Sequence, residues 1–164
     1  MLKIKGLSIR QPFTTFILFK LKDIEHRKYH TNFRGFFLIH SSKIPDHKFM
    51  KEYGFNKMHF INGCLLGIAE LIDVEHYGED SYGWRLDNVY KFQEALDYKG
   101  KQGFFEVELN EKIIEQVKKV LPLVCWDKIN DLKDYLHSGV NIFKKSEELD
   151  KPPVPPINRG GINA

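Results

Sequence analysis

The feature that most constrains the fold is the run from Cys64 to Val74, which is largely apolar. A strand with one solvated face alternates apolar and polar residues, whereas this run offers apolar side chains to both faces. It also contains the small residues Gly67 and Ala69, and a glycine inside a strand often marks a bulge or a bend. The run therefore predicts a long central strand, bent at Gly67, in a strongly curved sheet such as a small barrel.

Shorter strand patterns surround this run. Alternating or continuously apolar stretches predict further strands at residues 3–9, 24–29, 36–40, 84–89 and 105–109. Between residues 24 and 29, alternation places Glu25 and Arg27 on one face. Trp84 alternates with Leu86, which favours a core position for Trp84 over a base-stacking role that it and Tyr82 could otherwise share.

Three helices are predicted among these strands. The first begins at Pro12 and carries Phe13, Phe16, Ile17 and Leu21 at helical spacing, so these residues are expected to face the core. A second helix starts after Pro45-Asp46 and stops near Gly54, and a third is capped by Asn110. Strands of antiparallel type interleaved with helices predict an α+β fold.

The chain length bounds the domain organisation. Its 164 residues are enough for one domain with a full core. We expect that domain at residues 1–122, a helical extension at 123–149 with Ile129, Leu132 and Leu136 facing inward, and a Pro/Gly-rich tail at 150–164. The strand-like N-terminus has no leader pattern and no run is long enough to cross a membrane, which predicts a cytoplasmic protein.

The cysteines and histidines give no sign of a metal site. Cys64 and Cys125 are far apart in apolar surroundings, so buried thiols are expected in place of a disulfide. The histidines show no paired Cys/His spacing of the zinc-binding kind. We therefore expect neither a metal nor a cofactor.

Charge is distributed unevenly along the chain. The net charge is +3, yet residues 1–60 carry 12 Lys and Arg against 4 Asp and Glu, a balance of +8. Such a balance favours an anionic partner for this half, because attraction to phosphates supplies most non-specific nucleic-acid affinity. The alternative is that the two halves fold together and neutralise each other.

Polar side chains gather where predicted apolar elements end. The candidate ligand-binding residues are Arg10, Gln11, Lys22, Glu25, Arg27, His40, Ser41, Lys99 and Lys101. An Arg can bind a phosphate or a base edge with two donors, Lys acts as a point charge, and a Glu can accept from a base amino group. A structural ion pair for Lys22 and Glu25, a structural hydrogen bond for His40 and a solvated turn for Lys99–Lys101 remain alternatives.

Several of these motifs together resemble the ASCH domain of the PUA-like superfamily. The resemblance covers roughly residues 3–109. It rests on the segments Leu7–Pro12, Lys22–Arg27, Arg34–Lys43, Gly67–Leu71, Tyr82–Leu86 and Lys99–Val107. The family pattern has Gly where this chain has Lys20, and usually Thr at Asp23. The resemblance implies a small, mostly antiparallel PUA-like β-barrel flanked by helices.

The resemblance also bears on chemistry. Some ASCH proteins are amidohydrolases that deacetylate acetylcytidine with a Lys, a Thr nucleophile and a Glu, and Lys22 matches that Lys. Glu25 stands where the Thr would be, so Lys22 and Glu25 are the catalytic candidates only if the chain is an enzyme. Nearby cations weaken a carboxylate as base or nucleophile. We therefore expect no efficient acetylcytidine hydrolysis.

These observations favour a module that binds RNA or a nucleotide in a cationic cleft. The alternative is a hydrolase of modified nucleosides, or a ribonuclease, in the same cleft. A third possibility is a protein contact made by the C-terminal helix or the Pro-rich tail.

Overall fold

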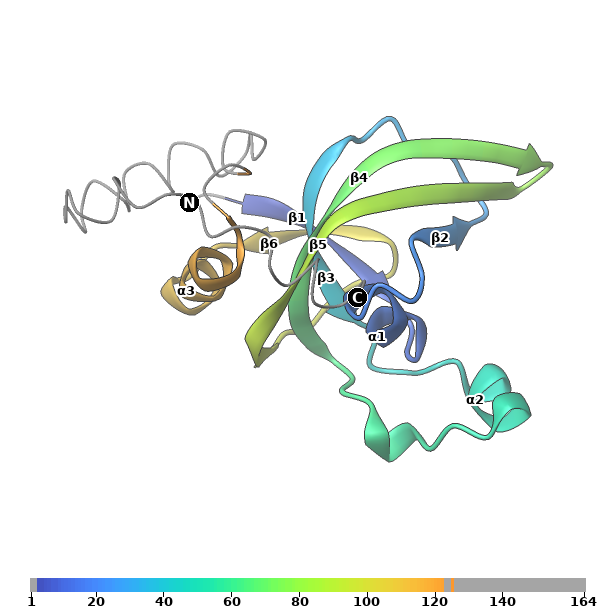
Figure 1. The fold of residues 1–164 in the computed structure, drawn as a ribbon, viewed down its shortest axis with the longest axis horizontal. Coiled ribbons are helices and arrows are strands. Elements are labelled where there is room, and N and C mark those ends of the chain that lie inside the picture. Colours follow the sequence, from blue (N-terminus) through green and yellow to red (C-terminus); the bar gives the residue numbers. More distant parts are fainter. Residues whose placement is uncertain (1–2, 123–124, 126–164) are drawn as a thin grey trace, which may run out of the picture.

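The computed structural model describes residues 3–122 and residue 125 (Figure 1). Its elements are β1 (Lys3–Ile9), α1 (Phe13–Leu18), β2 (Ile24–Arg27), β3 (Gly35–Ser41), α2 (His47–Tyr53), the 3-10 turn η1 (Lys57–His59), β4 (Cys64–Gly78), β5 (Ser81–Asp97), β6 (Phe104–Glu108) and α3 (Glu111–Val120). The predicted extension at 123–149 and the tail at 150–164 lie outside the described residues, apart from Cys125, which is buried.

The six strands form one sheet in the order β2-β5-β4-β3-β1-β6. Neighbouring strands are antiparallel except β1 and β3, which are parallel. This confirms the α+β prediction, with a mostly antiparallel sheet and three α-helices.

The central strand was predicted correctly. β4 lies between β3 and β5, and its pairing with β5 shifts register between Leu65 and Gly67. However, β4 continues to Gly78 and β5 runs as far as Asp97, well beyond the predicted ends. The residues near the turn of this hairpin are mostly polar and exposed, because the hairpin projects beyond the core (Figure 1). Apolar periodicity therefore gives no signal for that part of it.

Alternating side chains divide the core between the two faces of the sheet. Phe36 and Leu38 pack with the buried residues of α3, whereas Phe37 and Ile39 pack with those of α1. Trp84 is fully buried in the cluster with α1, as its alternation predicted. In Figure 1, α3 and α1 accordingly lie on opposite sides of the central strands.

The helix ends follow their predicted signals. The side chain of Asp46 accepts a hydrogen bond from the Phe49 amide, and Gly54 ends α2 in the left-handed conformation. Asn110 caps α3 in the same way through the Ile113 amide. None of the helices in the described ranges has the length and apolar composition needed to cross a membrane.

One expectation about the first helix was wrong. Leu21 is not on its buried face: α1 ends at Leu18, and Leu21 is 77% exposed. The chain turns at Lys20, which has a φ of 60° and so leaves the helical region. The apolar spacing therefore continued past the point where the backbone stopped being helical.

Candidate functional site

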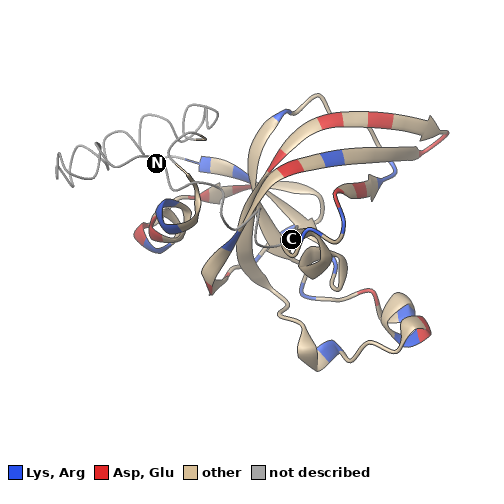
Figure 2. Ribbon diagram, in the orientation of Figure 1, with Lys and Arg blue, Asp and Glu red and all other residues tan. Residues whose placement is uncertain are grey.

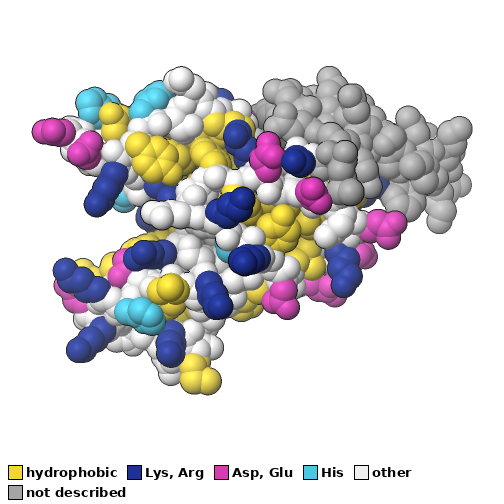
Figure 3. Space-filling model, turned by 180° about the vertical axis from the view of Figure 1, so that it is seen from behind, with side chains coloured by type: hydrophobic (Ala, Val, Ile, Leu, Met, Phe, Trp, Pro, Cys, Tyr) yellow, Lys and Arg dark blue, Asp and Glu magenta, His cyan; other side chains and the backbone are white. Residues whose placement is uncertain are grey.

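The molecule is notched on one side. Figure 3 shows the hollow between two lobes, one being the projecting β4–β5 hairpin and the other the region of α2 and η1, with Lys and Arg side chains along its borders. On the ribbon of Figure 2, basic positions mark α2 and η1, whereas the hairpin carries several acidic ones. Strand β2 lies between the two lobes in Figure 1.

Strand β2 pairs with the projecting β4–β5 hairpin, and we call these three strands together the hairpin arm. The two faces of this arm carry different side chains. Glu25 on β2 pairs in register with Trp84 on β5, and Arg27 pairs with Tyr82, which in turn pairs with His76 on β4. Directly opposed residues share a face. We call this the inner face, because Trp84 on it packs in the core cluster beneath α1. The opposite or outer face carries Asp73, Glu75, Tyr77 and Arg85.

Lys22 and Glu25 form an ion pair at the inner face. The Lys22 Nζ lies 3.4 Å from Glu25 Oε1, and the two side chains are only 20% and 8% exposed. The same ammonium lies 4.6 Å from the centre of the Phe13 ring, so it bridges β2 to α1. The structural ion pair that the sequence left as the alternative for these residues is therefore present, with the carboxylate almost entirely removed from solvent.

Arg27 is held beside them. Its Nη2 donates to the Ser8 carbonyl oxygen at 2.8 Å, and its guanidinium carbon lies 5.6 Å from the Trp84 ring centre. The hydrogen bond from Nη2 thus holds the guanidinium group of Arg27 against β1. The predicted shared face of Glu25 and Arg27 is confirmed by the register of β2 on β5.

Two polar atoms of this group have no protein partner. Glu25 Oε2 and Arg27 Nε are buried and make no hydrogen bond within the described residues. An unsatisfied buried polar atom costs about 1–3 kcal/mol, and more when it is charged. Because native proteins satisfy most such atoms, a carboxylate oxygen and a guanidinium N–H left over on one short strand leave hydrogen-bonding capacity that a water molecule or a ligand can fill.

His40 is fixed in one tautomer by its two neighbours. Its Nε2 lies 2.8 Å from the Tyr98 carbonyl oxygen, which can only accept, so Nε2 carries the hydrogen. Nδ1 then accepts from the Ser8 hydroxyl at 3.0 Å. Burial lowers the pKa of His40, although the bond to Tyr98 acts in the opposite direction. His40 is therefore a neutral imidazole at physiological pH.

Gly100 allows the basic turn Lys99–Gly103, which precedes β6, to pack against Ser8 and His40. A Cβ on Gly100 would overlap the His40 ring and approach Ser8 Oγ, so only glycine fits there. Gly103 continues the attachment, because its carbonyl accepts from the Ser8 amide at 3.2 Å. The turn is thus packed on Ser8 and His40, while the flanking Lys99 and Lys101 remain exposed.

The other predicted residues are placed differently. Arg10 is exposed at the end of β1. Gln11 is fully buried; its amide nitrogen donates to the Ile61 carbonyl at 2.8 Å and its oxygen accepts from the Thr15 amide and hydroxyl. Ser41 is also fully buried and bonds the backbone of Cys64 in both directions. Gln11 and Ser41 therefore hold the framework, and the structure does not bring them to the unsatisfied atoms.

Ser8 is the site residue that sequence reasoning missed. It sits within an apolar strand and is only 9% exposed, so locally it looks like a buried hydroxyl. Its importance comes from the parallel pairing of β1 with β3, which sets Ser8 opposite His40. The available signal was a lone polar residue in the run from Leu7 to Ile9.

No group of three His, Cys, Asp or Glu side chains suited to a metal ion occurs among residues 3–122 and 125. The Cys64 thiol lies 3.3 Å from the Asp97 carboxylate, and burial together with that contact raises its pKa to about 11.

In comparisons with known proteins, the chain matches no protein-family model, and no curated protein is significantly similar to it.

Proposed function

We propose that this chain binds RNA or a nucleotide at the inner face, on a PUA-like barrel of the ASCH type. The observation that carries the proposal is the pair of buried, unpartnered atoms, Glu25 Oε2 and Arg27 Nε. One accepts and the other donates, so the complementary ligand presents a donor and an acceptor. A nucleobase edge with an amino group beside a ring nitrogen or carbonyl has both.

The surroundings suit the rest of a nucleotide. Arg10, Lys99 and Lys101 are exposed cations that can contact phosphate, and the basic positions of α2 lie on the other lobe of the notch (Figure 2). Phosphate contacts position a nucleic acid, whereas base-edge contacts select it. The buried pair with its exposed cationic border separates these two tasks.

Two further observations support the ASCH assignment. The position at which that family has Gly is Lys20, and its φ of 60° lies in the region that glycine adopts most readily. The cationic turn Lys99–Gly103 packs on the first and third strands, as a motif shared across the family would if it lined the cleft.

A binding assay tests the proposal. Fluorescence anisotropy with a labelled single-stranded RNA 8-mer of mixed sequence is expected to detect weak binding that falls steeply with added salt. Arg27→Ala is expected to weaken it about tenfold, and Arg10→Ala/Arg27→Ala more, because two charges near phosphate are lost. Arg34→Ala is the matched control, since Arg34 faces Asp73 away from the site. Equal affinity of wild type and the double variant would refute the site.

The second candidate is a hydrolase of modified nucleosides or a ribonuclease. The Ser8 hydroxyl bonded to a neutral His40 favours it, because a hydroxyl beside a base is how a nucleophile is activated. We rank it below binding because Gly100 packs against both groups. Chromatography of acetylcytidine and of the RNA 8-mer after incubation with wild type and Ser8→Ala distinguishes them: turnover that is lost in Ser8→Ala would establish the enzyme.

A further inference from the structure

A pair of stacked rings lies beside the site on the projecting hairpin. The Tyr82 and His76 rings are 4.6 Å apart and inclined by 13°, and the His30 ring meets Tyr82 edge-on at 6.0 Å. His76 and His30 are exposed, and Tyr82 is half-buried because it also packs against the core cluster beneath α1. Figure 3 shows histidine and hydrophobic side chains gathered at the free end of that lobe.

The strand register connects this pair to the proposed binding site. Tyr82 is the direct partner of Arg27 across β2 and β5, and of His76 across β5 and β4. The three side chains therefore form one row on the inner face. The adjacent row holds Glu25, Trp84 and Val74, two residues further along each strand, a separation of about 7 Å.

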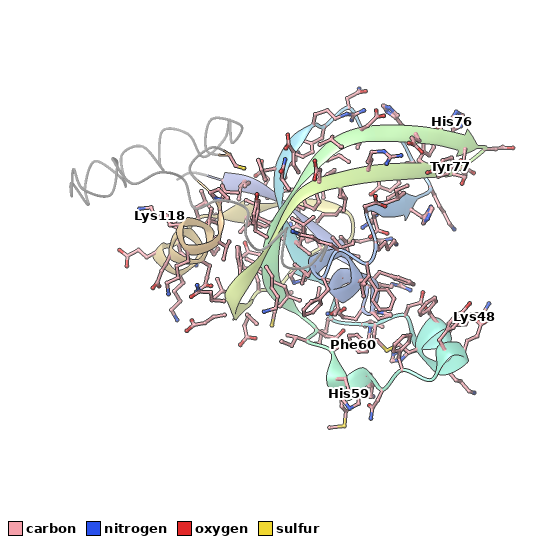
Figure 4. All side chains as sticks on the ribbon, in the orientation of Figure 1. Lys48, His59, Phe60, His76, Tyr77 and Lys118 are labelled. Atoms are coloured by element: carbon pink, nitrogen blue, oxygen red, sulfur yellow. The ribbon has the colours of Figure 1, made fainter. Side chains whose placement is uncertain are left out.

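The outer face of the same hairpin provides a contrast. There the Tyr77 hydroxyl donates to Glu75 at 2.8 Å, and its ring fills the space above Gly83. Both ends of Tyr77 are thus used by the protein, and it has a structural role. Figure 4 labels Tyr77 and His76 together at the end of the hairpin, although the strand alternation assigns them to opposite faces.

We propose that the His76–Tyr82 pair is a stacking platform for a second, unpaired base, so that the ligand is a single-stranded nucleic acid of at least two nucleotides. This rests on the proposed function and extends it. An aromatic platform beside a cation is how single strands are held, because every base has a face that stacks and every nucleotide has a phosphate. A duplex would keep its bases stacked on each other and could not use the platform.

The test compares affinity with its salt dependence, using full-length protein and the labelled RNA 8-mer. Tyr82→Ala is expected to weaken binding about tenfold while leaving the slope of log K against log salt unchanged, since stacking releases no counterions. Tyr82→Phe keeps the ring and is expected to bind like wild type. Tyr77→Ala, on the outer face, is the matched control and is also expected to bind like wild type.

The outcomes separate the two proposals. If Arg27→Ala weakens binding and lowers the salt slope while Tyr82→Ala matches wild type, the platform is wrong and the site stands. If wild type does not bind the RNA at all, both fall. His76→Ala, at an exposed position, guards against misfolding of Tyr82→Ala and is expected to lose about threefold in affinity. Equal binding of wild type, Tyr82→Ala and His76→Ala overturns the platform.

Discussion

The two faces of the hairpin arm each carry a carboxylate–cation pair, and the pairs differ in whether they are complete. On the outer face Glu75 contacts Arg85 and also accepts from Tyr77, and the ion-paired side chains remain 34% and 38% exposed. On the inner face Glu25 contacts Lys22 at 3.4 Å, with exposures of 8% and 20%, and its second oxygen has no partner.

The difference separates a pair whose hydrogen bonds are complete from a pair with an unpartnered oxygen on the same strands. Both pairs would count equally in a tally of charges. The outer pair is satisfied by the protein and by water, so nothing more is required of its surroundings. The inner pair is removed from water but does not make all the hydrogen bonds it can, and a ligand that makes the missing bonds would offset this cost.

The sharpest way to break this comparison is to remove the inner cation. Lys22→Ala leaves Glu25 as a buried carboxylate with no partner and is expected to lower the free energy of unfolding by about 2–3 kcal/mol at pH 7. Urea denaturation measures it. Lys22→Ala/Glu25→Gln is expected to recover part of that loss, because no unpaired buried carboxylate remains. If the double variant is no more stable than Lys22→Ala, the unpaired charge of Glu25 is not the cause of the lost stability.

A smaller effect is expected on binding from neutralising each carboxylate in turn. Glu25→Gln replaces an ionised acceptor by a weaker one and is expected to weaken RNA binding about tenfold, within the range of a base-edge contact. Glu75→Gln removes the same charge from the outer face and is expected to leave affinity unchanged. Anisotropy titrations at one salt concentration compare them, and equal affinities of the two variants would contradict the assignment of Glu25 to the binding site.

Sequence reasoning recovered what depends on local periodicity. Alternation along β2 placed Glu25 and Arg27 on one face, because side chains on a strand repeat every two residues. Local periodicity did not reveal the contacts of Gln11 and Ser8, which lie on either side of Ile9 and Arg10. Gln11 looks like a ligand residue, but its amide is used by Ile61 and Thr15. Ser8 meets His40 only through a strand pairing that spans 32 residues, which no local pattern reveals.

Acidification is expected to affect His40 and Glu75 in different pH ranges. Burial lowers the pKa of His40 in the folded state, so below about 6.5 the unfolded chain binds a proton that the folded chain does not. Stability is therefore expected to fall as pH drops below that value. The bonds from Arg85 and Tyr77 lower the pKa of Glu75, so its contribution is lost only as pH falls below about 4.5.

Thermal denaturation between pH 7 and 3 measures both steps. His40→Gln is expected to remove the first step and Glu75→Gln to reduce the second. If the loss of stability below about pH 6.5 persists in His40→Gln, it belongs to another histidine, and its assignment to His40 is wrong.

The smallest effect is expected from the outer pair itself. Arg85→Ala breaks an exposed ion pair and is expected to lower the free energy of unfolding far less than Lys22→Ala does, and less still at high salt. Urea denaturation at low and high salt measures it. A loss as large as that of Lys22→Ala would remove the distinction between the faces.

The position of β1 in the sheet has a consequence for how the protein is made. Of the described strands β1 is synthesised first, yet it lies between β3 and β6, and Lys3 pairs with Glu108, more than a hundred residues away. The β4–β5 hairpin is local and can form early, whereas closing the β1–β6 pair must wait until that distant segment has been synthesised. Ser8 can meet His40 once β3 has emerged, but Gly100 follows only with the approach to β6. We therefore expect the contacts of Ser8 with Arg27, His40 and Gly100 to be completed late, so that a nascent chain acquires the proposed binding surface only when nearly all of the described fold exists.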